Sequence, residues 1–355
     1  MLHMGEFNHI CRTHYQTLYN NEKIFSLMFA GLLTLSACHN NDEPNNPDDI
    51  TGNIYLAVSN TFEEGDMVIT AKGDIIYQCA PQTRITRILA DGSDWYAVAY
   101  QYLETGETGD IVIKNGNIIY TTTETIEDLC IDDGNIYTLQ DPDHWWNGQW
   151  VCKNFTHTYF LPTEQFASLQ MVVNHGDITL APIISNDACY WHNGELIAMQ
   201  GMDGELHNCY IDKDGDDVLI GINSDKYSRT GYWRNGNYSQ LDIKNNIRQV
   251  KLVGGKSYIL GSHYTSYAPN GQGINVVSSS DAVVIIDGEE QVLRTGNNIN
   301  YAKSMIQHNN DIYILVREND MTTVIKSFIY KNMKPIELDQ DITEREIIDF
   351  AIIGS

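Results

Sequence analysis

Residues 68–78 read VITAKGDIIYQ, an apolar strand followed by a tight turn and a second strand. The same pattern returns as IVIKNGNIIYT (111–121), WVCKNFTHTYFL (150–161), CYWHNGELIAM (189–199), GYWRNGNYSQL (231–241), VVIIDGEEQVL (283–293) and SFIYKNMKPIEL (327–338). The equivalent turn positions 73, 116, 155, 194, 236, 288 and 333 lie 39 to 52 residues apart. A period of this length indicates a repeat architecture.

A second pattern lies between these hairpins and consists of an apolar strand, a polar turn and another strand. Examples are ITRILADGSDWYAVAY (85–100), IEDLCIDDGNIYTLQ (126–140), NCYIDKDGDDVLIG (208–221) and SMIQHNNDIYILV (304–316). Each repeat therefore holds four short strands, which we name A to D in chain order. Asn-Gly and Asp-Gly suit the hairpin turns because those turns need positive φ. Phe155 and Met333 replace the glycine in two repeats, and we expect those two turns to differ.

The ends of the repeat region complement each other. Residues 53–58 look like a B strand with no A strand before it, and residues 346–353 look like an A strand with no B strand after it. Pairing of the two would complete the first sheet. We therefore predict an all-β fold over residues 51–355, a seven-bladed β-propeller with four antiparallel strands per blade and the C-terminal strand closing the first blade.

The N-terminal segment predicts the cellular location of the protein. Residues 24–37 read IFSLMFAGLLTLSA, an apolar run of 14 that is short for a membrane span and typical of a secretory signal. It ends in Leu35-Ser36-Ala37-Cys38. This ending resembles the lipobox of bacterial lipoproteins, which implies cleavage before Cys38 and acylation of its sulfur.

The segment after Cys38 is polar. Residues 39–50 hold several acidic side chains and two prolines and cannot form a packed core, so they indicate a disordered tether. The expected organisation is a signal segment and lipobox at 1–38, a tether at 39–50 and the propeller at 51–355. Acidic residues soon after the lipid-bearing cysteine resemble the surface-export signals of some Gram-negative lipoproteins. The resemblance implies an outer-membrane protein anchored by lipid, on the cell surface or on the periplasmic side.

Composition narrows the choice of partner. The chain of 355 residues has 22 basic and 47 acidic residues and a formal net charge of −25. This excludes nucleic acid binding through phosphates, which needs basic patches. A neutral ligand such as a sugar, a cation or a protein partner remains compatible with this charge.

The seven cysteines show no CxxC spacing. We expect Cys79, Cys130, Cys152, Cys189 and Cys209 to be small buried apolar residues. A bridge between Cys152 and Cys189 is the alternative. We predict no metal and no cofactor. The acidic run at 212–217 lacks the glutamate of a calcium loop and fits a hairpin turn better.

Loop length predicts the ligand-binding face. In a propeller the A–B and C–D turns emerge on one face and the B–C and D–A connections on the other. The B–C connections here are longer and more varied, and the one at 263–280 is the longest. Exposed aromatic rings with a polar edge suit sugar rings. The candidate ligand-binding residues are Tyr102, Asp143, Trp145, Trp146, Tyr227, Tyr264 and Tyr267.

Two alternatives stay open at this point. Trp145 or Trp146 could instead fold under its loop and pack on the next blade, whereas Trp150, Trp191 and Trp233 are expected in the core. No GxSxG or HExxH motif occurs, so no catalytic residue is predicted. The main hypothesis is a non-catalytic binding module for a glycan or an envelope protein. The second is a hydrolase or lyase acting on polysaccharide, which would need a close carboxylate pair.

Overall fold

The computed structural model describes residues 53–354 except 103–107, 143–147, 162–165, 183, 186, 224–229, 243, 270–274 and 321–322. The segments 1–38 and 39–50 lie outside the described residues, and with them Cys38. Residues 47–355 form one compact unit.

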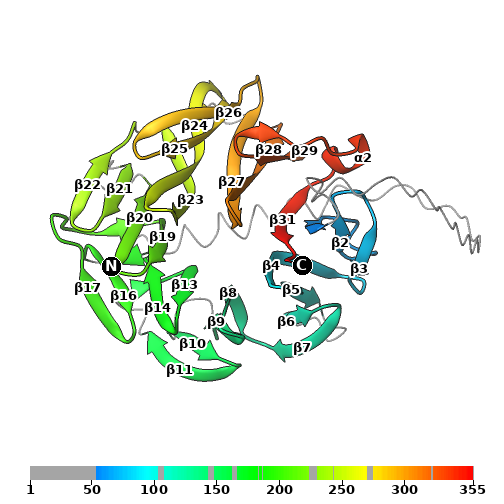
Figure 1. The fold of residues 1–355 in the computed structure, drawn as a ribbon, viewed down its shortest axis with the longest axis horizontal. Coiled ribbons are helices and arrows are strands. Elements are labelled where there is room, and N and C mark those ends of the chain that lie inside the picture. Colours follow the sequence, from blue (N-terminus) through cyan, green and yellow to red (C-terminus); the bar gives the residue numbers. More distant parts are fainter. Residues whose placement is uncertain are drawn as a thin grey trace, which may run out of the picture. The chain divides into compact units, whose positions relative to one another are not determined.

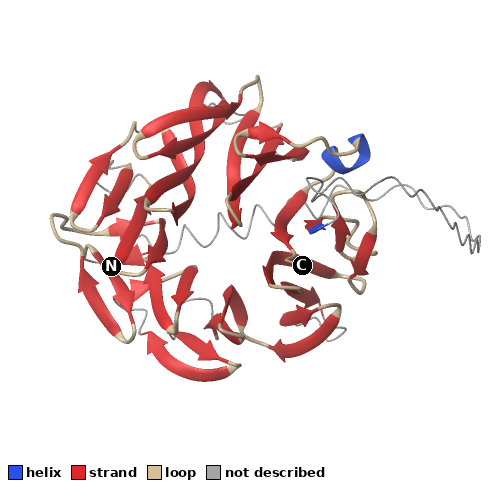
Figure 2. Cartoon of the chain, in the orientation of Figure 1, coloured by secondary structure: helices blue, strands red, loops and turns tan. Residues whose placement is uncertain are grey.

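The described residues are mostly β-strand, in antiparallel sheets of four strands (Figure 2). The first sheet has the order β3-β2-β1-β31, formed by β1 (Ile54–Val58), β2 (Met67–Thr70), β3 (Ile75–Gln78) and β31 (Ile347–Ile352). The next comprises β4 (Thr83–Asp91), β5 (Asp94–Tyr102), β6 (Thr108–Lys114) and β7 (Asn117–Thr122). It is followed by β8 (Thr125–Asp132), β9 (Asn135–Asp141), β10 (Gln149–Lys153) and β11 (Thr156–Leu161).

Two further four-stranded sheets follow in the middle of the chain. They are β13 (Gln170–Asn174), β14 (Asp177–Ala181), β16 (Cys189–His192) and β17 (Glu195–Ala198), then β19 (Cys209–Asp214), β20 (Asp217–Ile222), β21 (Gly231–Arg234) and β22 (Asn237–Gln240). A small sheet beside them consists of β12 (Phe166–Ala167), β15 (Ile184–Ser185) and β18 (Leu206–His207).

The C-terminal third forms an eight-stranded sheet. Its first half is β23 (Asn245–Val253), β24 (Lys256–Pro269), β25 (Asn275–Ile286) and β26 (Glu289–Arg294), and its second half is β27 (Ile299–His308), β28 (Asp311–Asn319), β29 (Val324–Lys331) and β30 (Lys334–Pro335). One parallel pair, Ser280 with Ile299, joins the halves. The short helix α2 (Gln340–Thr343) leads into β31.

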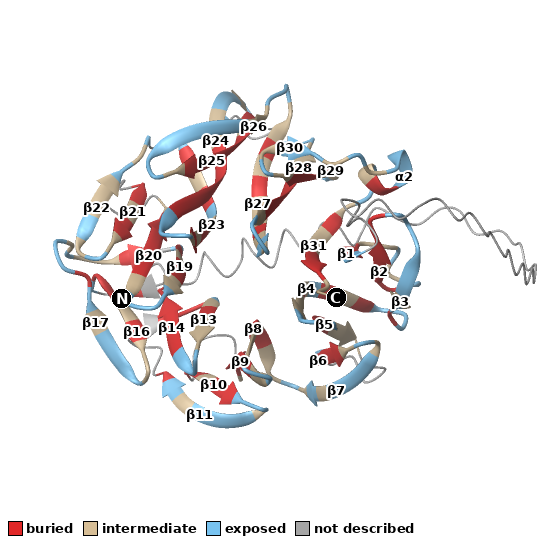
Figure 3. Cartoon of the chain, in the orientation of Figure 1, coloured by how far each residue is buried: buried red, intermediate tan, exposed pale blue. Residues whose placement is uncertain are grey.

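The sheets follow one another around a common axis in chain order, which is the arrangement of a β-propeller (Figure 1). Inner strands contact their neighbours, for example β31 with β4, β13 with β19, and β27 with β31. The outermost strands, such as β7 and β11, are largely exposed (Figure 3). The buried apolar residues form clusters that each lie between two neighbouring sheets; one joins Tyr313 of β28 to Phe350 of β31.

The predicted pairing of the two ends is present. Ile54 to Val58 pairs with Ile347 to Ile352 in antiparallel register. Side chains from the second half of the eight-stranded sheet also hold β31. Arg317 Nε donates to the Ile347 carbonyl at 2.8 Å, Ser304 Oγ donates to Asp349 at 3.0 Å, and Lys303 Nζ donates to the Ile348 carbonyl. The last strand is therefore fixed by polar side chains as well as by its ladder.

An asparagine at the turn between the third and fourth strands locks the sheet together. In the β4–β7 sheet, Asn115 Oδ1 accepts the backbone N–H of Trp95 at 2.9 Å, and Asn115 Nδ2 donates to Asp94 at 2.7 Å. The same pair of bonds recurs at Asn154, Asn193, Asn235 and Asn332. At the equivalent Asp287, the carboxylate accepts the Ser257 N–H at 2.9 Å. We call this contact the turn clamp.

The two turns that lack glycine keep the same conformation, which corrects our expectation that they differ. Asn154 and Phe155 have φ of 47° and 63°, and Asn332 and Met333 have 48° and 65°. Positive φ costs a residue with a side chain about 1–2 kcal/mol. Packing offsets that cost, since the Phe155 ring stacks on Tyr120 with centroids 4.1 Å apart, and Met333 packs on the cluster around Tyr330.

The cysteines are where the sequence predicted them. Cys79, Cys152, Cys189 and Cys209 are buried, and Cys130 is partly buried. None of these five described cysteines forms a disulfide, so the alternative Cys152–Cys189 bridge is absent. Burial raises the pKa of Cys79 and of Cys152 to about 12. These thiols are therefore packing groups and not nucleophiles.

The hydrogen bonds of the turn clamp predict a loss of folding stability that the turn conformation alone would not predict. In Asn115→Gly the positive φ is retained at no steric cost, but the Trp95 N–H loses its acceptor. We expect the free energy of unfolding to fall by about 1–2 kcal/mol in urea titrations of the full chain. Asn309→Gly is the matched control, because Asn309 has φ of 55° in a turn and its side chain makes no hydrogen bond to the described residues. Equal stability of the two variants would contradict the clamp.

The contact of Lys303 with β31 predicts a pH dependence. Burial lowers the pKa of Lys303 to about 8; Arg317 adds to this shift, and Asp349 and Glu346 oppose it. Between pH 8 and 10.5 the unfolded chain binds a proton that the folded chain has lost, so folding stability rises with pH. Relative to Lys303→Met, the wild type should gain about 2–3 kcal/mol over this range in urea titrations. Parallel pH profiles for the two proteins would contradict the assignment.

Candidate functional site

The sequence-predicted ligand residues fall into two groups. Asp143, Trp145, Trp146 and Tyr227 lie outside the described residues. Tyr102 is the last residue of β5, and Tyr264 and Tyr267 lie on β24. The structure therefore brings Tyr264 and Tyr267 together on one element, and places Tyr102 on another sheet.

The segment 263–280, expected to be a long loop, is largely a β-hairpin, which corrects that expectation. β24 runs to Pro269 and pairs with β25 as far as Pro269 opposite Asn275. The inner strand β23 pairs with β24 only as far as His263. Residues 264–269 and 275–279 therefore extend beyond the inner strand of their sheet. We call this the extended hairpin.

The extended hairpin presents aromatic and hydroxyl side chains. The rings of Tyr264 and Tyr267 meet edge to face with centroids 6.3 Å apart. Tyr264 Oη accepts a hydrogen bond from Asn246 Nδ2 at 2.6 Å, which fixes that ring. Tyr267 is 53% exposed. An exposed ring beside a held one offers an apolar face that a flat ligand can cover.

Hydroxyl groups line the hairpin between Tyr264 and Tyr267 and on the strand opposite. Ser266 Oγ lies 2.7 Å from Ser278 Oγ and 2.6 Å from Ser279 Oγ, and Thr265 Oγ1 lies 2.7 Å from Ser279 Oγ. Each hydroxyl both donates and accepts, so the ladder can exchange partners with a ligand hydroxyl. No charged side chain lies in 264–269 or 275–280. This surface suits a neutral polar ligand.

Ionisable groups begin at the base of the extended hairpin. His263 Nδ1 lies 3.2 Å from Glu290 Oε1, and His263 is the register partner of Asp281. Beyond them, Arg294 pairs with Glu318 at 2.6 Å, and Asn298 donates to the same carboxylate at 2.7 Å. The Arg294 guanidinium and the Asn298 amide help to hold the pKa of Glu318 below its usual value, although burial acts in the opposite direction.

Tyr102 belongs to a separate aromatic cluster. Its ring lies 5.3 Å from Phe62 and 5.7 Å from Tyr100, edge to face in both pairs. Arg84 lies over Phe62 at 5.7 Å, and its guanidinium donates to Asp66 at 2.7 Å. This packing holds Tyr102 against the connection between β1 and β2.

Two aspartates of the acidic run at 212–217 bind groups of the same chain. Asp212 accepts the Leu252 N–H at 2.7 Å and pairs with Lys251 at 3.0 Å. Asp217 binds Arg234, which lowers the Asp217 pKa. These contacts agree with the hairpin-turn interpretation.

One cluster that could hold a metal ion was not predicted from sequence. Ligand atoms of Asp132, Asp133 and His175 lie within 4.8 Å of one another. Both Asp132 oxygens already accept backbone N–H groups, of His175 at 3.0 Å and of Gly176 at 2.7 Å. The geometry is explained by these bonds, which join two neighbouring sheets.

The three tryptophans expected in the core are buried to different extents. Trp191 and Trp233 are buried. Trp150 is partly buried and stacks on His157 with centroids 4.4 Å apart. None of the described helices is long and apolar enough to cross a membrane.

No protein-family model matches the chain, and no curated protein is similar to it in sequence. Solved structures similar to it include the β-propeller domain of the Trilobed protease from Pyrococcus furiosus, at 10% identity and a TM-score of 0.44, over 74% of this chain and 97% of that one. BamB from Moraxella catarrhalis is 12% identical with a TM-score of 0.41, over 75% and 88%. A Trypanosoma rangeli sialidase is 12% identical with a TM-score of 0.42, over 78% of this chain and 58% of that one.

Proposed function

We propose that the chain is a lipid-anchored cell-surface protein of the outer membrane whose seven-bladed propeller binds a glycan through the extended hairpin, without catalysis. The single observation that carries the binding role is the exposed Tyr267 ring on an uncharged, hydroxyl-lined hairpin that extends beyond its sheet. A neutral sugar offers a C–H face for the ring and hydroxyls for the ladder.

The proposed count of seven blades is supported by the pairing of the strands and by the number of apolar clusters. The eight-stranded sheet counts as two blades, because one parallel pair joins its halves. The described apolar clusters number seven, and each lies between two neighbouring sheets. The pairing of β31 with β1 supports closure of the ring.

The glycan proposal is tested on the full chain, purified in detergent and applied to a glycan array. Tyr267→Ala should weaken binding about five- to thirtyfold, since stacking on one aromatic ring contributes about 1–2 kcal/mol. Ile75→Ala is the control, because it removes a 65% exposed apolar side chain from the outer strand β3. A Trp145→Ala/Trp146→Ala variant tests the connection that follows β9. Wild-type binding by Tyr267→Ala would exclude the hairpin as the site.

A hydrolase or lyase acting on polysaccharide is the second candidate. The observation that favours it is the grouping of His263, Glu290 and Asp281 at the base of the extended hairpin. The same array separates the two functions. Release of new reducing or unsaturated ends from a bound glycan would identify an enzyme, and binding without release supports the binding protein.

Anchoring is tested through Cys38. Metabolic labelling with an alkyne fatty acid should mark the wild-type chain and leave Cys38→Ala unlabelled, because the thioether sulfur is then absent. Cys79→Ala is the control, since the buried Cys79 thiol should not be acylated. Labelling that persists in Cys38→Ala would overturn the lipid anchor.

A further inference from the structure

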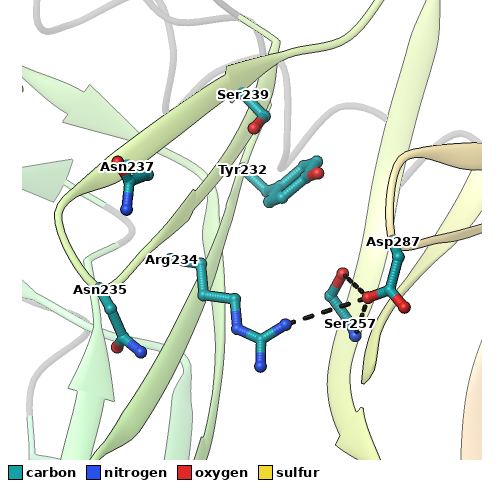
Figure 4. A pocket seen from close by; sticks show the side chains of 7 residues that line it. All are labelled: Tyr232, Arg234, Asn235, Asn237, Ser239, Ser257 and Asp287. Carbon is teal, nitrogen blue, oxygen red and sulfur yellow. Dashed lines mark hydrogen bonds and ion pairs between the residues drawn. The ribbon is translucent and has the colours of Figure 1, made fainter. Parts of the chain in front are cut away.

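A polar groove lies at the ends of β24 and β25 opposite to the extended hairpin, at the short turns of the strands. It has a volume of about 380 Å³ and is lined by Tyr232, Arg234, Asn235, Asn237, Ser239, Ser257 and Asp287 (Figure 4). One wall is the β21–β22 hairpin, and the other is formed where β24 begins and β25 ends. These are turns of the A–B and C–D kind, and the extended hairpin is a B–C connection.

The groove lies where an isoleucine stands at the position that a tryptophan occupies in the preceding sheet. Trp233 of β21 packs on Tyr190 of β16, with ring centroids 6.1 Å apart. Tyr232 is equivalent to Tyr190, because each directly precedes the tryptophan of its own third strand.

The position that Tyr232 should meet in the following sheet is Ile285. It pairs with Ile259 as Trp233 pairs with Ile220. An isoleucine lacks the indole with which Trp233 meets Tyr190 between the two preceding sheets. Gly288 adds to the gap, because a Cβ there would lie 3.5 Å from Tyr232 Oη.

The groove's charges are compensated within the protein. Arg234 Nε donates to Asp217 at 3.0 Å, its Nη2 donates to the Gly255 carbonyl at 2.8 Å, and its Nη1 lies 3.9 Å from Asp287. Two carboxylates thus face one guanidinium. An anionic ligand would meet net negative charge here, and the chain's total of −25 adds to that repulsion.

The remaining groups suit hydroxyls. Asp287 Oδ1 accepts from Ser257 N–H and Oγ at 2.9 and 3.1 Å, which fixes the carboxylate plane. Asn237 and Ser239 lie on the opposite wall, with Tyr232 between the walls (Figure 4). Fixed planar donors and acceptors beside an aromatic side chain can bind adjacent hydroxyls of a ring in pairs. The volume lies within the range of small-molecule sites.

We propose that this groove is a binding site for a single neutral pyranose unit, separate from the extended hairpin. The β21–β22 hairpin supplies Tyr232, Asn237, Ser239 and Arg234, and Asp287 faces Arg234 from the other wall, so that the two bind a pair of hydroxyls between them. The site depends on the isoleucine at position 285 and does not depend on the function of the extended hairpin.

The test is saturation-transfer NMR on the full chain in detergent, with the methyl glycosides of glucose, galactose and mannose as probes. At least one should bind with a dissociation constant of about 1 mM, a value ordinary for a single small ring. Asn237→Trp should fill the groove and weaken that binding at least tenfold. Asn117→Trp is the matched control, because Asn117 follows Asn115-Gly116 as Asn237 follows Asn235-Gly236 and borders no described cavity.

Methyl glucuronide serves as an anionic probe and should bind more weakly than the neutral glycosides. Tyr267→Ala should leave binding in the groove unchanged, which separates this site from the one on the extended hairpin. The proposal is overturned if no neutral glycoside binds, if Asn237→Trp binds as the wild type does, or if methyl glucuronide binds better than the neutral glycosides.

Discussion

The repeated sheets depend on the turn clamp, an Asn or Asp side chain that joins the turn of one hairpin to the first residues of another strand. In the β8–β11 sheet, Asn154 Oδ1 accepts the Ile136 N–H at 2.9 Å, and the Asn154 backbone N–H donates to the Ile136 carbonyl at 2.7 Å. The left-handed conformation of the asparagine aims both groups at the same residue. A four-stranded sheet with short strands and an exposed outer edge is marginal by itself, so locking its turn end stabilises it as a unit. The first sheet has Lys72 at the clamp position, and there the pairing of β1 with β31 takes over this role.

Neighbouring sheets are then joined through side-chain acceptors on their inner strands. Asp128 accepts the Met171 N–H at 2.7 Å, Gln170 accepts the Ile211 N–H at 2.9 Å, and Gln249 accepts the Met305 N–H at 2.6 Å. Each bond runs from the inner strand of one sheet to the inner strand of the next. Because these bonds are short and buried, the centre of the propeller is specified by polar geometry as well as by apolar packing. The connections on the other face are left free to vary in length, and the extended hairpin arises there.

Much of the fold could be predicted from sequence because local residue patterns determine the strands and the turns. Alternating apolar residues and Asn-Gly turns gave the strands, and the unpaired strands at 53–58 and 346–353 gave the closing pair. The clamp could not be predicted, since the acceptor and donor lie about twenty residues apart and the turn already explains the asparagine. The expectation that the turn at Phe155 would differ was wrong for a similar reason. The ring that offsets the positive φ of Phe155 is that of Tyr120, which belongs to the preceding sheet. At 263–280, composition rich in Gly and Ser indicated a loop, and the hydroxyl ladder that supports strands there exists only once the two segments pair.

The two proposed sites show how a repeat protein can acquire a binding surface without disturbing its scaffold. One repeat gains residues in a connection and forms the extended hairpin, and the same repeat has Ile285 where the preceding repeat has Trp233, which leaves the groove beside Tyr232. Neither change touches a turn clamp, since Asn235 and Asp287 keep theirs on both sides of the groove. Both surfaces also share a constraint from the chain's net charge of −25. A strongly acidic protein repels anionic polymers at any face, so selection for a ligand favours neutral hydroxyl groups. Recognition of hydroxyl groups needs aromatic rings and fixed planar donors and acceptors in the protein. It needs no excess of positive charge.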